Sequence, residues 1–312
     1  MSGTRDKPPE AGAVSPLTLL LLKGALIGMS DSVPGVSGGT IAVLTGIYAR
    51  LITAISAFDL QALRLLSRRE FSAAWRHVDA SFLLPLAGGM LCGLLLSANT
   101  VLFALEHYPV LLGAFFMGLV LGALFLLRGE FALATPAGMV LFGVGVVVVG
   151  GLAWLEPVSG EASNGRLFLA GAVAISAMLL PGLSGAFLLL LMGVYEPMLA
   201  ALVAFDLAPL VSFAAGCAVG ILVFSRALAW LLSHFRAQAY SLIGGLLLGS
   251  LLVIWPWRFS TSPTPVWPTD YAAAGLEAQL GAAVLCGLFG LALVVGLQQI
   301  FESQKTAAKQ QN

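Results

Sequence analysis

Two polar motifs with the same residue order interrupt this apolar sequence. The first, SDSVPGVSGGT, covers residues 30–40, and the second, LLPGLSGAF, covers residues 179–187; we call them the first and second elbow. Proline removes a backbone donor and glycine permits conformations that other residues avoid, so each motif predicts a loop between two half-helices. Free N–H groups and a serine hydroxyl where the second half-helix begins are suited to binding an oxyanion. We expect the two elbows to converge from opposite faces of the membrane and to form one anion-binding site.

The elbow residues expected to hold such an anion carry either a hydroxyl or a backbone N–H group that no side chain obstructs. They are Gly35, Ser37, Gly38, Gly39 and Thr40 in the first elbow, and Gly182, Ser184 and Gly185 in the second. The alternative is purely structural, because serine is a common helix cap and glycine allows helices to pack closely. The sequence leaves both interpretations open.

Ionisable residues in apolar surroundings are functional candidates because their burial is costly. Asp31 could carry a proton that couples transport to a gradient, or it could be a cap that bonds to the backbone or to Ser32 and Thr40. Arg226 is predicted to be a buried charge about 12 Å inside its helix end, where it could bind phosphate, pair with an acid or snorkel to the interface. The residues to which we assign coupling or gating roles are Asp31, Ser30, Tyr48, Tyr195 and Asn99.

Composition places these motifs in a membrane. The chain has 312 residues, of which 59% are hydrophobic and 10% charged, and several apolar stretches are long enough to cross a bilayer. A net charge of zero argues against nucleic acid as a partner. The three cysteines, Cys92, Cys217 and Cys286, lack the spacing of metal ligands, so neither a metal nor another cofactor is expected.

An internal repeat organises the chain. A shift of 147 positions aligns residues 24–60 with residues 171–207, and beyond an insertion the shift becomes 127. We therefore expect two units, residues 1–155 and 156–312, each with a re-entrant helical hairpin followed by three transmembrane helices. The first has a hairpin at 16–57, a polar insertion at 60–79 and spans at about 80–105, 109–127 and 132–153; the second has a hairpin at 167–205 and spans at about 207–233, 237–255 and 276–300.

Length and charge predict how the units are oriented. The apolar piece at 17–29 measures about 20 Å as a helix, less than the hydrocarbon core of about 30 Å, so each hairpin should enter the membrane and return. Three crossings per unit then invert the second copy, which leaves only Arg166 and Arg258 among the basic loop residues on the outer side. The prediction is an all-α polytopic membrane protein of two inverted repeats, the architecture of secondary transporters, with both termini in the cytoplasm.

Four stretches carry a family resemblance: SDSVPGVSGGTIAVLTGIY, LLPGLSGAFLLLLMGVYEP, LEHYPVLLGAFFMGLVLGAL and SLIGGLLLGSLLVIWPW. Together they resemble the bacterial polyprenyl-phosphate transporter family over about residues 23–258. The resemblance implies a protein of the bacterial cytoplasmic (inner) membrane that returns undecaprenyl phosphate, a lipid carrier for cell-wall precursors, from the outer to the inner leaflet. It implies phosphate binding at the elbows and a polyprenyl-phosphate lipid and the bilayer as partners, and it is compatible with a homo-oligomer.

Two other functions would use the same residues. A transporter for a small soluble anion would have the same elbows on a water-filled route. Intramembrane serine proteases share the G-x-S-G pattern but pair their serine with a histidine deep in a neighbouring helix. Here His107 and His234 end predicted spans and the motif occurs twice, so we expect a transporter and not an enzyme.

Overall fold

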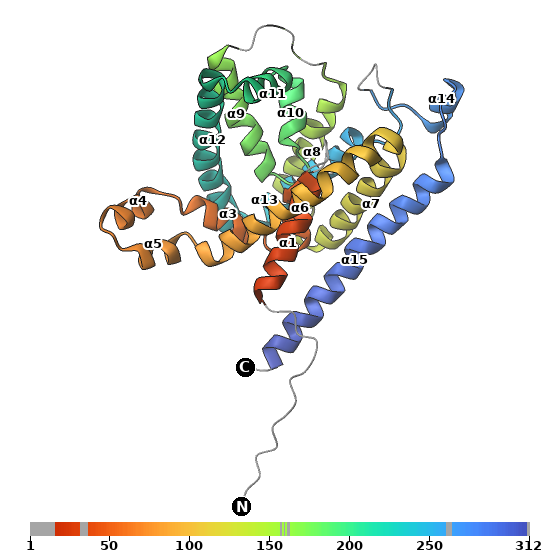
Figure 1. Ribbon diagram of the computed structural model, residues 1–312. Coiled ribbons are helices and arrows are strands. Elements are labelled where there is room, and N and C mark those ends of the chain that lie inside the picture. The colour runs from red at the N-terminus through yellow and green to blue at the C-terminus, as the bar shows by residue number, and fades with distance from the viewer. Residues whose placement is uncertain are drawn as a thin grey trace, which may run out of the picture.

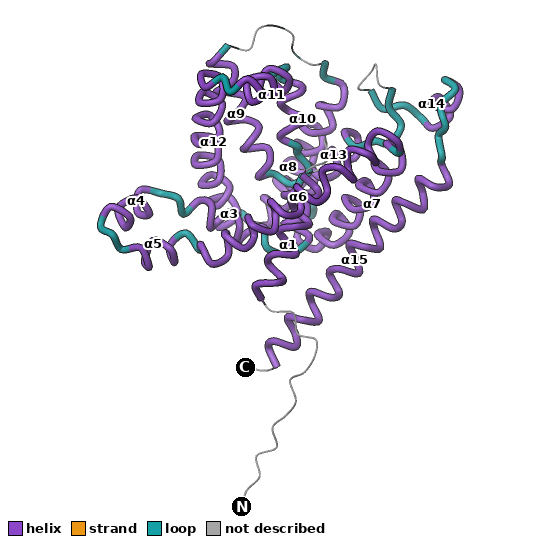
Figure 2. Tube along the Cα trace, viewed as in Figure 1, coloured by secondary structure: helices purple, strands orange, loops and turns teal. Residues whose placement is uncertain are grey.

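The computed structural model describes residues 16–31, 37–156, 158, 160, 163–259 and 264–310, which form helices joined by short loops (Figures 1 and 2). The first repeat contains α1 (Pro16–Asp31), α2 (Gly38–Leu44), α3 (Tyr48–Ser56), α4 (Leu60–Ser67), α5 (Phe71–His77), α6 (Ala80–His107), α7 (Pro109–Leu127) and α8 (Pro136–Gly151). The second contains α9 (Asn164–Leu179), α10 (Gly185–Leu191), α11 (Tyr195–Ala204), α12 (Leu207–His234), α13 (Arg236–Val253), α14 (Pro268–Ala273) and α15 (Leu280–Gln310). Short 3₁₀ turns follow α7 and α8 at Arg128–Glu130 and Leu152–Trp154.

Five of the described helices are long and apolar enough to cross a membrane, namely α6, α7, α8, α12 and α13. They coincide with five of the six predicted spans. The sixth falls on α15, whose apolar part is Leu280–Gly296. The count rises to as many as seven if each of two bent helix pairs is one span. The chain is therefore an all-α, multi-pass membrane protein.

The return limb of each predicted hairpin is broken into two helices. In the first repeat α2 packs back against α1, and the chain then bends by 119° between α2 and α3. In the second, α10 packs against α9, and the bend to α11 is 109°. Gly46 (φ 70°) and Gly193 (φ 61°) lie at these bends, in the left-handed region that glycine tolerates best. Each of these glycines interrupts the return limb after the seven residues of its first helix.

The long helices pack in pairs that repeat along the chain. Within the repeats, α1 packs on α6 and α9 packs on α12. Between the repeats, α7 packs on α15 and α8 packs on α13. Glycines permit each approach: a methyl group at Gly118 of α7 would lie 2.0 Å from the Gly287 carbonyl oxygen, and one at Gly245 of α13 would lie 2.0 Å from that of Phe142. The two sequence units are therefore interlocked through two helix pairs, α7–α15 and α8–α13.

Two adjacent glycines of α6 offer a direct test of this close packing. A methyl group at Gly89 would lie 2.2 Å from the Leu21 carbonyl oxygen of α1, whereas the nearest atom to one at Gly88 is 4.0 Å away. Gly89→Ala should therefore destabilise the solubilised protein by roughly 1–3 kcal/mol through overpacking. Gly88→Ala should be neutral or slightly stabilising, because alanine favours helix by up to about 1 kcal/mol. Thermal unfolding in detergent measures the difference, and equal midpoints for the two variants would contradict the packing.

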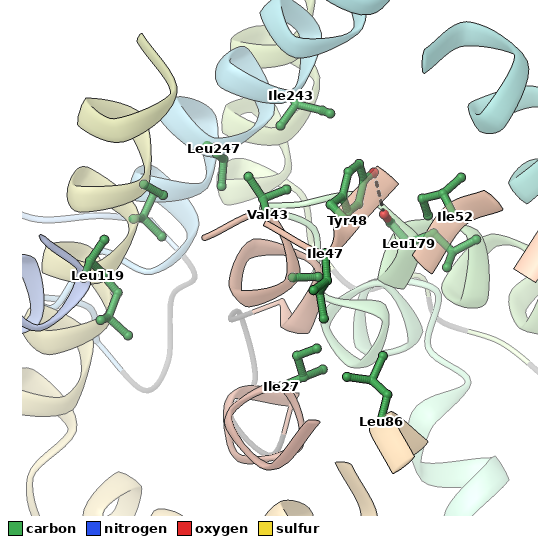
Figure 3. Packing of buried hydrophobic residues seen from close by; sticks show 14 of the residues in the cluster. Ile27, Val43, Ile47, Tyr48, Ile52, Leu86, Leu119, Leu179, Ile243 and Leu247 are labelled. Atoms are coloured by element: carbon green, nitrogen blue, oxygen red, sulfur yellow. Dashed lines mark hydrogen bonds between the residues drawn. The ribbon is translucent and has the colours of Figure 1, made fainter. Parts of the chain in front are cut away.

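The central core draws side chains from both repeats (Figure 3). Ile27, Val43 and Ile52 of the first hairpin pack there with Ile243 and Leu247 of α13. Tyr48 is also buried in this cluster, at the first residue of α3. The apolar core thus surrounds the place where the two elbows meet.

Candidate functional site

In the first elbow, a hydrogen bond joins the end of α1 to the start of α2. Residues 32–36, which include the predicted anion ligand Gly35, lie outside the described residues. Asp31 ends α1, and its carboxylate accepts a 2.6 Å hydrogen bond from the backbone N–H of Gly38. A methyl group at Gly38 would lie 2.6 Å from the carboxylate, so a larger residue here would displace the Asp31 side chain. The structure therefore shows the capping role that was the alternative for Asp31.

The second elbow turns at Gly182, whose φ of +87° lies in the left-handed region. A methyl group there would be strained and would also lie 2.9 Å from the Leu246 carbonyl oxygen. Ser184 caps α10, since its hydroxyl oxygen accepts a hydrogen bond of 3.4 Å from the N–H of Phe187. The hydrogen of that hydroxyl remains available to another acceptor.

The two elbows touch, as predicted, although they are more than 140 residues apart in sequence. The Ser37 hydroxyl donates to the Leu180 carbonyl oxygen at 3.1 Å, and its oxygen makes no capping bond to α2. The Gly182 N–H donates to the Thr40 hydroxyl oxygen, also at 3.1 Å. Gly39 packs beside them, because a methyl group there would lie 3.2 Å from the Pro181 nitrogen.

Tyr48 adds a third link between the repeats. Its hydroxyl donates to the Leu179 carbonyl oxygen at 2.9 Å, the bond drawn in Figure 3. Tyr195, the equivalent residue of the second repeat, is 41% exposed. The contacts at the elbows are therefore asymmetric: side chains of the first repeat bond to the backbone of the second.

A cavity of about 280 Å³ lies beside the junction of the elbows, and we call it the polar cavity because its mainly apolar lining carries a carboxyl and a hydroxyl group. Its polar groups include Asp31 from the first repeat and Ser184 from the second, with Gly185 next to that serine. The remaining lining comes from α9, the second elbow, α10 and α12: Ala174, Ile175, Met178, Leu183, Ala186, Leu189, Phe213 and Cys217. The cavity can hold a small polar group against a carboxyl and a hydroxyl.

A second cavity, of about 250 Å³, lies on another side of the end of α1 and is almost wholly apolar. Helices α1, α2, α7 and α15 line it. It contains two hydroxyls, but Ser30 donates to the Ile27 carbonyl oxygen and Thr45 to that of Ile41, each at 2.9 Å. Since both hydroxyl hydrogens are used within their own helices, the cavity favours an apolar occupant.

Arg226 lies on α12 and lines neither cavity. Its side chain is exposed, and its guanidinium donates to the Phe58 carbonyl oxygen after α3 at 2.7 Å and to Leu222 of its own helix. The neighbouring helices therefore do not bury this side chain, and its role in binding phosphate remains a prediction. The side chain of Asn99 lies outside the described residues, so its predicted role remains a prediction.

The internal repeat did not identify two basic residues that stabilise the hairpin bends by hydrogen bonds. Lys23 is buried, and its ammonium donates to the Thr45 carbonyl oxygen at 2.8 Å. Arg166 donates to the Met192 carbonyl oxygen, which is the equivalent position of the second repeat. The two carbonyls align in the repeat but the two cations do not, because Lys23 aligns with Ala170. A search for a basic residue in the first limb of each hairpin, without requiring alignment, would have found both.

Comparison with known proteins gives consistent matches. Residues 27–265 match a family model described as undecaprenyl phosphate translocase-like. A polyprenyl-phosphate transporter of Vibrio cholerae serotype O1 is 36% identical over 241 residues, which cover 77% of this chain and 78% of that protein. A polyprenyl-phosphate transporter of Staphylococcus aureus is 33% identical over 258 residues, covering 76% and 85%. No solved structure matches the chain.

Proposed function

The chain belongs to the undecaprenyl phosphate translocase-like family, and from this premise we propose that it moves a polyprenyl phosphate from the outer to the inner leaflet of the bacterial cytoplasmic membrane. The observation that carries the proposal is the polar cavity beside two touching elbows, within the family match. No covalent step is involved. The hydroxyls of Ser37 and Ser184 bond with backbone groups of the two elbows, which suits binding and positioning.

The phosphate head group occupies the polar cavity in this proposal. The Ser184 hydroxyl donates to a phosphate oxygen, and the backbone near Gly185 lets that oxygen approach. The carboxylate of Asp31 already holds the Gly38 N–H, so a phosphate that uses the first elbow must displace it. Ser37 and Thr40 join the binding set only when their bonds to the second elbow open.

Proton coupling follows from placing Asp31 in the same cavity. Two negative charges in a site of low dielectric constant repel strongly, so the head group enters most readily when Asp31 carries a proton. Protonation also weakens the hold of Asp31 on the Gly38 N–H. Uptake of the lipid and of a proton are thereby linked at one carboxyl group.

The isoprenoid tail lies along the apolar cavity between α1, α2, α7 and α15 and continues into the bilayer. Adjacent residues of α1 favour this division, because Ser30 lines the apolar cavity and Asp31 lines the polar one. Alternating access in two inverted units, with both termini in the cytoplasm, would expose the head group to each leaflet in turn.

The decisive experiment measures polyprenyl phosphate in each leaflet. Purified protein is placed in liposomes that contain undecaprenyl phosphate, and a membrane-impermeant reagent reports the phosphate exposed outside. Protein should speed the exchange of lipid between leaflets over protein-free liposomes. In cells, deletion of the gene together with other recycling transporters should raise surface-exposed lipid phosphate. No change in either assay would refute the proposal.

A bulky side chain in the apolar cavity separates lipid transport from transport of a small soluble anion. Leu44 lines this cavity at the end of α2, and Leu44→Trp would fill part of it. We expect the variant to transport a long-chain polyprenyl phosphate several-fold more slowly, while a short-chain analogue is affected less. Val148→Trp on the exposed face of α8 is the matched control. Equal effects on both substrates would favour a water-filled route.

A further inference from the structure

The insertion at 60–79 forms a two-helix arm, α4 and α5, that extends sideways from the bundle (Figure 1). Its connections fix its depth. The arm follows α3, one half of a bent helix pair that is apolar enough to enter a membrane, after the three residues 57–59, and it leads into α6, a membrane span that begins at Ala80. An element held between two membrane-embedded helices in this way lies at the level of the membrane surface.

Two side-chain contacts hold the base of the arm in place. His77 Nε2 lies 3.1 Å from Asp59 Oδ1, and Asp59 also caps α4 through the N–H of Ala62. Arg50 of α3 makes two hydrogen bonds to the Asp79 carboxylate, at 2.7 and 3.1 Å. The bond from Arg50 holds the pKa of Asp79 below its usual range. The chain segments that enter and leave the arm are thus both held by side-chain contacts, so the arm has a defined direction.

The arm exposes large apolar side chains that the bundle does not cover. Leu60 is 71% exposed, Leu63 is 63% and Leu66 is 49%, and they lie on one arc of α4. On α5, Phe71 (64%) and Trp75 (50%) are four residues apart and share a face. Helices with such a face and a polar opposite face are typical of the lipid headgroup region, where tryptophan is also favoured.

The remaining surface of the arm is basic. Exposed arginines occur in α4, at the tip and in α5: Arg64, Arg68, Arg69 and Arg76. Glu70 is the one exposed acid between residues 60 and 77. Arg69 adopts a left-handed conformation (φ 60°), and the Glu70 N–H donates to the Leu65 carbonyl oxygen at 2.9 Å, which ends α4 and presents the basic tip.

We propose that the α4–α5 arm lies in the headgroup layer of the membrane, with its leucine, phenylalanine and tryptophan side chains inserted, and that its arginines bind anionic phospholipid. Charge complementarity favours anionic lipid over neutral lipid, because each arginine near an anionic membrane surface contributes about 1 kcal/mol to the free energy of membrane binding. The arm would anchor the first repeat beside the first hairpin, through Arg50 of α3.

Spin labels on opposite arcs of α4 test the position of the arm. The full-length protein, with its three cysteines replaced by alanine, receives a nitroxide at Leu63→Cys or, as the matched control, at Gln61→Cys. In liposomes, oxygen should relax the label at 63 more strongly, and a water-soluble nickel chelate the label at 61. Two labels equally accessible to the chelate would overturn the proposal, as would a label at 63 shielded from both agents, which indicates a protein partner or second copy.

The charge part has its own measurement. Spin-labelled phosphatidylglycerol should associate with the wild-type protein more than phosphatidylcholine does, and the ratio should fall by up to about fivefold per charge in Arg68→Gln/Arg69→Gln. An unchanged ratio would overturn the assignment to anionic lipid. Neither experiment uses transport as its readout, so the result stands apart from the proposed function.

Discussion

Asp31→Asn should reduce transport of polyprenyl phosphate by about tenfold or more, which corresponds to about 1.4 kcal/mol of barrier height. Asparagine keeps an oxygen that can accept the hydrogen bond from the Gly38 N–H, so the elbow should retain its geometry. What the variant loses is the ability to bind and release a proton within the cavity. The leaflet-resolved liposome assay measures the rate, with thermal unfolding as a check that the fold persists.

The dependence on a proton gradient gives the same variant a second readout. If a proton neutralises Asp31 before the phosphate enters, acidifying the side from which the lipid departs should accelerate the wild-type protein, and Asp31→Asn should not respond. Asp206→Asn is a matched control, because Asp206 also accepts a backbone N–H, that of Ala208, but lies exposed at the start of α12. Wild-type rates in Asp31→Asn, or a preserved response to the gradient, would remove the carboxyl from the mechanism.

Gly182→Ala should be the most destabilising of the conservative elbow substitutions. The left-handed backbone alone costs a residue with a side chain roughly 1–2 kcal/mol. The new methyl group would also crowd the Leu246 carbonyl oxygen and disturb the N–H bond to Thr40, adding roughly 1–3 kcal/mol. Thermal unfolding in detergent measures the loss of stability, and the liposome assay measures how much transport the variant retains.

Gly275→Ala is the control for backbone strain. Gly275 has nearly the same φ, +82° against +87°, but no atom would lie within 4 Å of an added methyl group. The difference between the two variants therefore isolates the contacts at the elbow. If both lose the same stability, the contact between α13 and the second elbow does not contribute.

The repeated motifs allowed the spans and the meeting of the elbows to be predicted. Hydropathy is sufficient for helices such as α7, whose predicted and observed bounds are both residues 109–127. Juxtaposition of the elbows followed from symmetry, since two equal loops at membrane depth need partners for their backbone groups. The bonds from Ser37 to Leu180 and from Tyr48 to Leu179 confirm it.

Other features depended on details that neither periodicity nor repetition encodes. The direction in which Arg226 points depends on the rotation of α12 against α3, which a single sequence does not give. Lys23 and Arg166 serve equivalent carbonyls from positions that do not align, so a comparison by register passes over them. The insertion at 60–79 was predicted as a polar segment because its leucines are interspersed with charged and polar residues, yet it folds into two short helices.

The exchange of partners between the repeats, α7 with α15 and α8 with α13, decides how the molecule can move. Two halves joined in this way cannot rock as separate bodies without breaking the two close helix contacts between them. The hinge must instead run across both repeats: α7, α8, α13 and α15 would form a stationary scaffold, while the α1–α6 and α9–α12 pairs shift against it. The protein would then consist of one static layer and two mobile helix pairs. The boundaries between these parts would follow the packing of the helices and not the two sequence repeats.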